Sequence, residues 1–70
     1  MLRVGTTVEW NWGNGKGRGK IAQIFRKDVT RTIKGSSVSR KASADDPAYL
    51  IRQDDGDEVL KSRSELSRVE

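Results

Sequence analysis

The chain of 70 residues has no cysteine and no histidine, which excludes disulfides and thiolate metal sites and removes the commonest general base and zinc ligand. Its net charge of +4 is uneven, because residues 1–35 hold eight Lys/Arg against two Asp/Glu, whereas residues 36–70 hold six against eight. No apolar run approaches the ~20 residues of a membrane span, and the first residues lack the apolar stretch of a signal peptide, so we expect one cytoplasmic domain over residues 1–70 without membrane association.

The first predicted strand covers residues 8–12, where apolar Val8, Trp10 and Trp12 alternate with polar residues. Alternation with a period of two is typical of a strand that buries one face. A glycine-rich stretch at 13–17 follows, and this composition predicts a flexible loop between the first strand and the next.

A second strand is expected over residues 19–26, with a bulge or strong bend at 24–25, where the apolar spacing slips. Residues 30–33 and 38–41 then flank a Lys-Gly-Ser-Ser turn at 34–37, which predicts a β-hairpin. This hairpin carries few large apolar side chains, so we expect it to project from the domain or to lie at its edge.

The last third of the chain predicts another hairpin and a closing turn. Residues 49–53 and 58–61 are rich in β-forming types and flank Asp-Asp-Gly-Asp at 54–57, the strongest turn signal in the sequence. Ser62 and Glu65 match the S-x-x-E capping box, which predicts a short helical turn. Together these elements describe a small all-β barrel. Its predicted core is Val8, Trp10, Ile21, Ile24, Phe25, Tyr49, Ile51, Leu60 and Leu66.

Three blocks of the sequence, in this order, resemble one known family. They are VEWNWGNGKGRGKI, VTRTIKGSSVSRKAS and DDPAYLIRQDDGDEVLKSRSEL, and they cover nearly the whole chain. The blocks are similar to the hypervirulence-associated Tudor-domain family, a domain of unknown function whose bacterial members are often stand-alone chains of this length. The resemblance implies an all-β, five-stranded SH3-like (Tudor-type) barrel with a short C-terminal helical turn and a non-catalytic interaction role. It brings no established ligand and no binding residues.

Basic residues supply the main candidate site. The glycine-rich stretch does not fit the phosphate-binding pattern G-x-x-x-x-G-K-[ST], so we interpret it as a plain loop. If the second strand and the first hairpin lie side by side, basic side chains from both could form one positive face for nucleic acid or another polyanion. Trp12, beside the loop, could then stack on bases. The candidate binding residues are Trp12, Lys16, Arg18, Lys20, Arg31, Lys34 and Arg40.

The aromatic and acidic residues offer a further alternative. Trp12 and Tyr49 could form two walls of a methyl-lysine cage, with Asp54 or Asp55 as the anion. Trp10, Phe25 and Tyr49, however, fall where a small barrel needs core filler, which leaves few walls for such a cage. The acidic clusters are interpreted as turns, because Asp tolerates left-handed geometry and bonds to nearby backbone N–H groups.

Catalysis has little support in the sequence, because a serine nucleophile needs an activating base and no histidine is present. We therefore expect a monomeric, non-catalytic interaction module with no metal and no cofactor. The leading hypothesis is binding of a protein or peptide segment through loops and an open edge strand, since such an edge readily accepts an added strand. Nucleic-acid binding through the basic N-terminal half is the alternative, and methyl-lysine recognition is the third.

Overall fold

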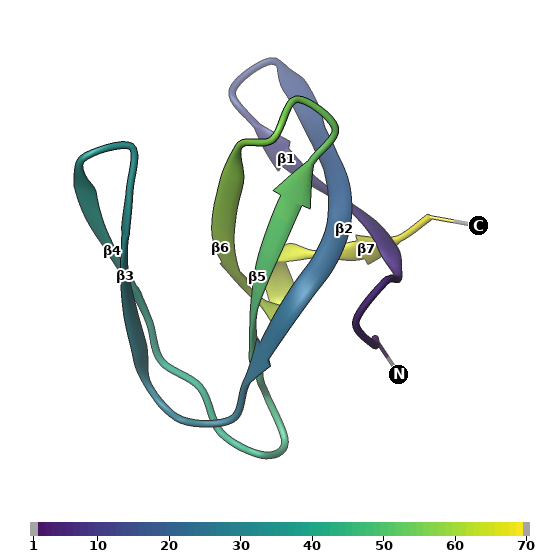
Figure 1. Cartoon of the computed structure of the whole chain (residues 1–70). Helices are drawn as coiled ribbons and strands as arrows, with labels where there is room; N and C mark the ends of the chain where they lie inside the picture. The colour runs from purple at the N-terminus through teal and green to yellow at the C-terminus, as the bar shows by residue number, and fades with distance from the viewer. Residues whose placement is uncertain (1, 70) are drawn as a thin grey trace.

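The computed structural model of the chain describes residues 2–69, and its regular elements are β-strands with one short 3-10 turn (Figure 1). The elements are β1 (Thr7–Trp12), β2 (Gly15–Phe25), β3 (Val29–Ile33), β4 (Ser36–Arg40), β5 (Ala48–Gln53), β6 (Glu58–Ser62), η1 (Arg63–Glu65) and β7 (Ser67–Arg68).

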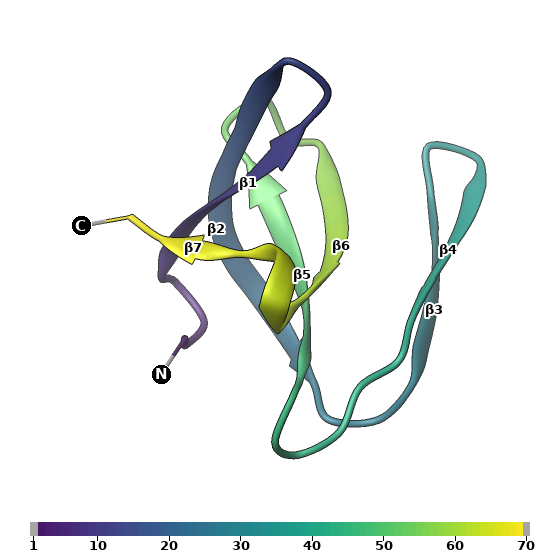
Figure 2. The same cartoon turned by 180° about the vertical axis from the view of Figure 1, so that it is seen from behind.

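Five strands form one antiparallel sheet in the order β6-β5-β2-β1-β7, and β3 pairs only with β4. Figures 1 and 2 show the larger sheet curling around a common interior, while the β3–β4 hairpin (residues 29–40, hereafter the arm) stands off beside β6. The expected all-β fold with a C-terminal helical turn is confirmed. Within the described residues β6 pairs only with β5 and β7 only with β1. The outer edges of these two strands do not pair with each other, so the curled sheet is not a closed barrel. Its fifth strand is β7, which the sequence did not predict.

The turn between β1 and β2 is much shorter than the predicted loop at 13–17. Trp12 lies opposite Gly15 and Trp10 opposite Gly17, so the strands run together almost to their joining residues. A β-carbon built on Gly17 would lie 2.4 Å from Cε2 of Trp10. The loop prediction was therefore wrong for a packing reason, because a glycine in β2 makes room for the Trp10 indole.

A β-bulge in β2 lies at Ala22, two residues before the predicted position at 24–25. The register of β2 with β5 shifts between Ile21 and Gln23, which leaves Ala22 as the extra residue. Because side chains alternate along a strand, an extra residue reverses which positions face inward. Ile24 therefore lies opposite the buried Tyr49 and packs against the core.

The interior of the curled sheet holds one apolar cluster. Ile24 and Phe25, both predicted as core, are only partly buried. Ile24 packs against the rim of the cluster, whereas the guanidinium carbon of Arg31 lies 5.6 Å from the centroid of the Phe25 ring. The cluster consists of Leu2, Val8, Trp10, Ile21, Tyr49, Ile51 and Leu66, of which Leu2 was not predicted.

A second apolar layer lies on the opposite face of β5 and β6. Leu50 is opposite Leu60 in the strand register, one residue out of phase with the inward-facing Ile51. Both leucines are buried, with 3% and 2% of their surface exposed, although neither belongs to the interior cluster. The arm covers this face, since Ile33 and Val38 of the arm line the same groove as Leu60.

The arm closes through a two-residue turn, rather than the predicted four residues at 34–37. Ile33 lies opposite Ser36, and the two residues between them have positive φ angles, 51° at Lys34 and 77° at Gly35. Positive φ at both central residues defines the type I′ turn, whose twist matches that of paired strands.

Candidate functional site

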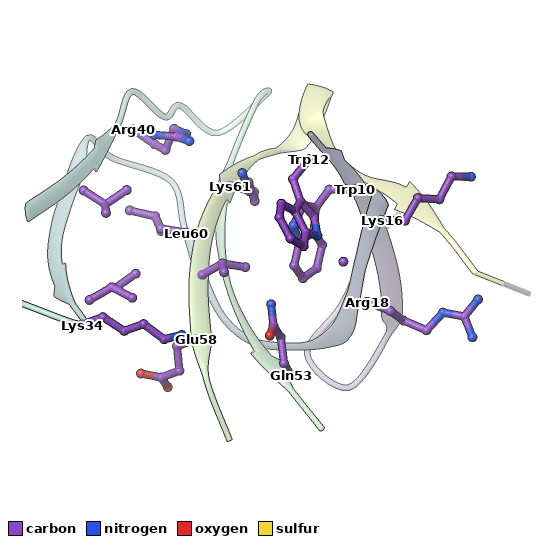
Figure 3. A pocket seen from close by; sticks show the side chains of 14 residues that line it. Trp10, Trp12, Lys16, Arg18, Lys34, Arg40, Gln53, Glu58, Leu60 and Lys61 are labelled. Atoms are coloured by element: carbon purple, nitrogen blue, oxygen red, sulfur yellow. The ribbon is translucent and has the colours of Figure 1, made fainter. Parts of the chain in front are cut away.

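A groove of about 650 Å³ lies between the arm and β6 and continues over β6 to the open end of the curled sheet (Figure 3). On the arm it is lined by Ile33, Lys34 and Val38. We call the open end of the sheet the mouth. The mouth is formed by Trp10, Trp12, Gln53 and Lys61.

The strand register places the side chains of β6 alternately on the two sides of this groove. Lys61 is opposite Tyr49, so it lies on the inner face of the sheet, whereas Leu60 is opposite Leu50 on the outer face. Figure 3 shows the same division, with Leu60 directed toward the arm and Lys61 lying on the side of the two tryptophans. β6 therefore runs between an apolar wall and an aromatic mouth.

The outer edge of β6 carries backbone groups that β5 does not use. The N–H of Gln53 donates to the carbonyl of Asp57 at 2.7 Å, and the N–H of Arg63 donates to the carbonyl of Pro47 at 3.1 Å. In an antiparallel pair of strands, hydrogen-bonded and non-hydrogen-bonded residue pairs alternate, and these two bonds set which pairs are which. Glu58 and Leu60 belong to non-hydrogen-bonded pairs, so their N–H and C=O groups point away from β5. β6 has no second strand partner within residues 2–69.

Ion pairs bridge the groove at both ends. At the tip of the arm, Nζ of Lys34 lies 2.6 Å from Oδ2 of Asp57 in the β5–β6 turn. At its base, Nε of Arg40 donates to Oε1 of Glu65 in η1 at 2.8 Å, and Nζ of Lys61 lies 3.6 Å from Oε2 of Glu65. The arm is thus joined to the sheet by side chains, since it shares no strand pairing with it.

These ion pairs shift the pKa values of two groups. A hydrogen bond to Asp57 and the charge of that carboxylate raise the pKa of Lys34. Partial burial opposes the charge of Glu65, but hydrogen bonds from Arg40 and from the Ser62 backbone, with the charges of Arg40 and Lys61, outweigh it and lower the pKa of Glu65. The charged form of Glu65 is therefore the one that the folded state favours.

Acid is expected to loosen the base of the arm through Glu65. A carboxyl group whose pKa is lowered by folding adds stability above its unfolded pKa, about 4.3, and this stability is lost as the pH falls through the lower, folded pKa. The Glu65→Gln variant should lose about 0.5–1 kcal/mol of unfolding free energy at neutral pH, and its deficit should vanish in acid. Thermal unfolding followed across this pH range measures the difference.

The reciprocal variant provides the check on this prediction. Arg40→Gln removes the main partner of Glu65 and should flatten the same acidic limb of the stability curve. Stability curves for both variants that run parallel to the wild type throughout the acid range would contradict the role assigned to Glu65.

Of the predicted basic residues, Lys16, Arg18, Lys34 and Arg40 line the groove together with Trp12, whereas Lys20 and Arg31 do not. Lys16, Arg18 and Lys20 alternate with buried positions of β2 and so share its outer face. Figure 3 shows Lys16 and Arg18 directed away from the groove, and Glu9 lies within 3.5 Å and 3.6 Å of their charged groups.

The other candidate residues lie on or near the arm. Arg31 stacks on Phe25 and donates to Oε1 of Gln23 at 3.3 Å, while Lys34 and Arg40 are held in the two bridging ion pairs. β2 and the arm do not share a sheet, and the contacts of Arg31 with Phe25 and Gln23 join them through side chains. Trp12 is 63% exposed and lies at the mouth.

The third alternative, a methyl-lysine cage, loses one of its walls. Tyr49 is 2% exposed and belongs to the interior cluster, so it cannot face a ligand. Asp55 accepts a hydrogen bond from the N–H of Asp57 at 2.9 Å, and the N–H of Gly56 donates to the carbonyl of Gln53 at 2.9 Å. This acidic cluster is a turn, as predicted.

An open edge strand was expected but was not assigned to β6, and the apolar wall beside it was not predicted, although one signal in the sequence pointed to that wall. Ala48 to Ile51 is a run of four apolar residues, and all four are buried. An unbroken apolar run indicates a strand buried on both faces, and such a strand requires something, here the arm, to cover its outer side.

Within residues 2–69 no helix is long and apolar enough to cross a membrane, and no group of three or more acidic side chains could hold a metal ion. The curled antiparallel sheet and its 3-10 turn before the last strand agree with a match to a Tudor-domain family, a class of typically non-catalytic binding modules whose fold is SH3-like. The chain belongs to the family described as the TUDOR domain of hypervirulence associated proteins, whose model it matches over residues 5–66. No curated protein and no solved structure shows significant similarity to it.

Proposed function

We propose that the domain is a non-catalytic module that binds a protein segment in the groove between the arm and β6. The observation that carries this proposal is the unpaired outer edge of β6. This edge runs along the groove, with the apolar wall on one side and the exposed Trp12 on the other. Edge strands present unused hydrogen-bonding groups, and exposed aromatic side chains are common anchors at protein interfaces. Both features serve the recognition of a polypeptide.

The groove offers little for catalysis. Glu58 is the one carboxylate that lines it, and Arg52 lies 3.3 Å from that carboxylate. General acid–base chemistry needs a positioned proton donor and acceptor. Amines, two guanidinium groups, an amide and apolar side chains make up the remaining lining, which supports binding without chemistry.

Selection of peptides tests the proposal. The domain is presented with a display library of random linear peptides, and the affinity of each selected peptide is measured for the wild type and for two groove variants, Trp12→Ala and Ile33→Ala. Both variants should weaken binding by about tenfold or more, because hot-spot truncations typically cost above about 1–2 kcal/mol. Lys20→Ala, on the outer face of β2, is the matched control and should bind like the wild type.

The nucleic-acid alternative makes the opposite prediction. Single- and double-stranded DNA and RNA should then bind at low salt and dissociate as salt is added, with Lys20→Ala weakened and Ile33→Ala unchanged. Failure to select any peptide, together with that pattern, would overturn the proposed function.

A further inference from the structure

We infer that the bound segment is acidic and extended, and that it joins the domain as an additional β-strand on the outer edge of β6. This inference rests on the proposed function and names the chemistry of its ligand. Three features of the groove carry it, namely the backbone groups of β6, the contrast between its two walls, and the balance of charge along it.

The outer edge of β6 has backbone N–H and C=O groups that could pair with one more strand. Glu58 and Leu60 direct N–H and C=O groups outward, whereas the next outward N–H, that of Ser62, is taken by Oε1 of Glu65 at 2.9 Å. The open stretch is therefore bounded by η1 at one end and by the Asp57 turn at the other. A short extended segment can satisfy the groups within it, as in other complexes formed by strand addition.

The two walls specify the side chains of such a strand. Successive residues of an added strand point to opposite faces of the sheet. One set would meet Ile33, Val38 and Leu60 on the arm side, where apolar residues fit. The other set would face the mouth, where Trp12 is exposed and the side chain of Lys61 retains 21% exposure.

The charge along the groove favours acidic residues in the bound segment, because Lys34 and Arg40 lie on the arm side and Lys61 lies at the mouth. Lys34, Arg40 and Lys61 line it, and Arg40 and Lys61 share the single carboxylate of Glu65. At the tip, Lys34 is 68% exposed and its partner Asp57 is 40% exposed. Exposed ion pairs contribute little to stability, so a ligand carboxylate can replace Asp57 at small cost. A basic segment would meet these three cations instead.

Synthetic peptides of alternating sequence test the inference. One probe alternates Glu with Val, a second alternates Lys with Val, and a third is the Glu-Val peptide with alternate backbone nitrogens methylated. The Glu-Val peptide should bind at least about tenfold more tightly than the Lys-Val peptide. Methylation in the register that faces β6 should abolish binding, because it removes the donors that strand addition requires.

Amide hydrogen exchange locates the bound strand. The N–H groups of Val59 and Lys61 face β5 and should exchange slowly with or without peptide. The N–H of Leu60 should exchange fast in the free domain and slow down when the Glu-Val peptide is present. This contrast between neighbouring residues distinguishes strand addition from contact with side chains alone.

Two variants test whether the positive charge of Lys34 contributes to the binding of an acidic peptide. Asp57→Asn frees Lys34 and should tighten Glu-Val binding several-fold, whereas Lys34→Asn removes the cation and should weaken it. Asn accepts the positive φ angle found at position 34, so the turn of the arm is kept. Lys20→Gln, at a residue that does not line the groove, is the control for net charge and should have no effect.

Failure of this inference is distinct from failure of the proposed function. Equal affinity for the two alternating peptides, an unprotected Leu60 amide in a formed complex, or no binding of the Glu-Val peptide while library peptides still need Trp12 would each overturn the acidic strand and leave the groove as a binding site. Loss of all peptide recognition would overturn both.

Discussion

Replacing Gly17 by alanine is expected to remove a large part of the free energy of unfolding. The added methyl group would lie 2.4–2.6 Å from three atoms of the Trp10 indole, which is 4% exposed and packed in the interior cluster. The ring cannot swing into solvent without opening that cluster. Overpacking of this kind typically costs about 1–3 kcal/mol. Urea denaturation followed by tryptophan fluorescence measures the loss.

Gly15 provides the matched control for this prediction. It lies on the same strand two residues earlier, and an added β-carbon would meet no atom within 4 Å. Gly15→Ala should therefore keep nearly the wild-type stability. If Gly17→Ala were as stable as Gly15→Ala, the view that β2 uses glycine to seat Trp10 would be wrong. Because Trp10 also lines the groove, Gly17→Ala should weaken peptide binding as well.

Leu60→Ala is expected to have an equal or larger effect, about 2–5 kcal/mol, which is typical for truncation of a buried leucine. Leu60 is 2% exposed and lies opposite Leu50 in the layer beneath the arm. Its loss should therefore release the arm as well as destabilise the sheet. Equilibrium denaturation measures the first effect, and hydrogen exchange of the β3–β4 amides measures the second.

The Leu60 prediction remains testable even if the alanine variant fails to fold. Leu60→Met keeps most of the volume and should cost less than about 1.5 kcal/mol, which allows the exchange rates of the arm to be compared in a folded protein. Val4→Ala, at a side chain that is 62% exposed, is the surface control. Unchanged exchange in the arm of Leu60→Met, combined with a measurable loss of global stability, would show that the arm does not depend on this layer.

Much of the main sheet was predictable because its signals are local. Alternation in residues 8–12, the Asp-Gly turn after β5 and the capping box at Ser62 and Glu65 each identify an element from a few adjacent residues. The capping box is present as predicted, with the N–H of Ser62 donating to Glu65. Local chemistry of this kind requires no knowledge of the remainder of the fold.

Elements that depend on distant partners were missed or misplaced. β7 has two residues, Ser67 and Arg68, and neither favours a strand by itself; its pairing with β1 defines it. The glycines at the start of β2 suggested a loop, and the role of Gly17 is apparent only when the Trp10 ring is placed beside it. Both cases show tertiary packing overriding local preference.

The candidate site was only partly predictable for the same reason. An open edge strand and Trp12 were expected as binding features, and the structure places both along one groove. Partners of the basic residues could not be read from spacing, since Arg40 and Glu65 are 25 positions apart. Charge counted along the chain therefore could not show that Lys34 and Arg40 are held in ion pairs.

The overhanging arm also bears on how the domain behaves at high concentration. An exposed, flat edge strand is a template on which identical chains can pair and aggregate. Here a second molecule would have to slide its own edge beneath the arm and past the Lys34–Asp57 bridge to reach β6. We therefore expect the arm to hinder pairing with a folded sheet more than with a single extended segment, so that a chain with a shortened arm self-associates more readily than the full chain.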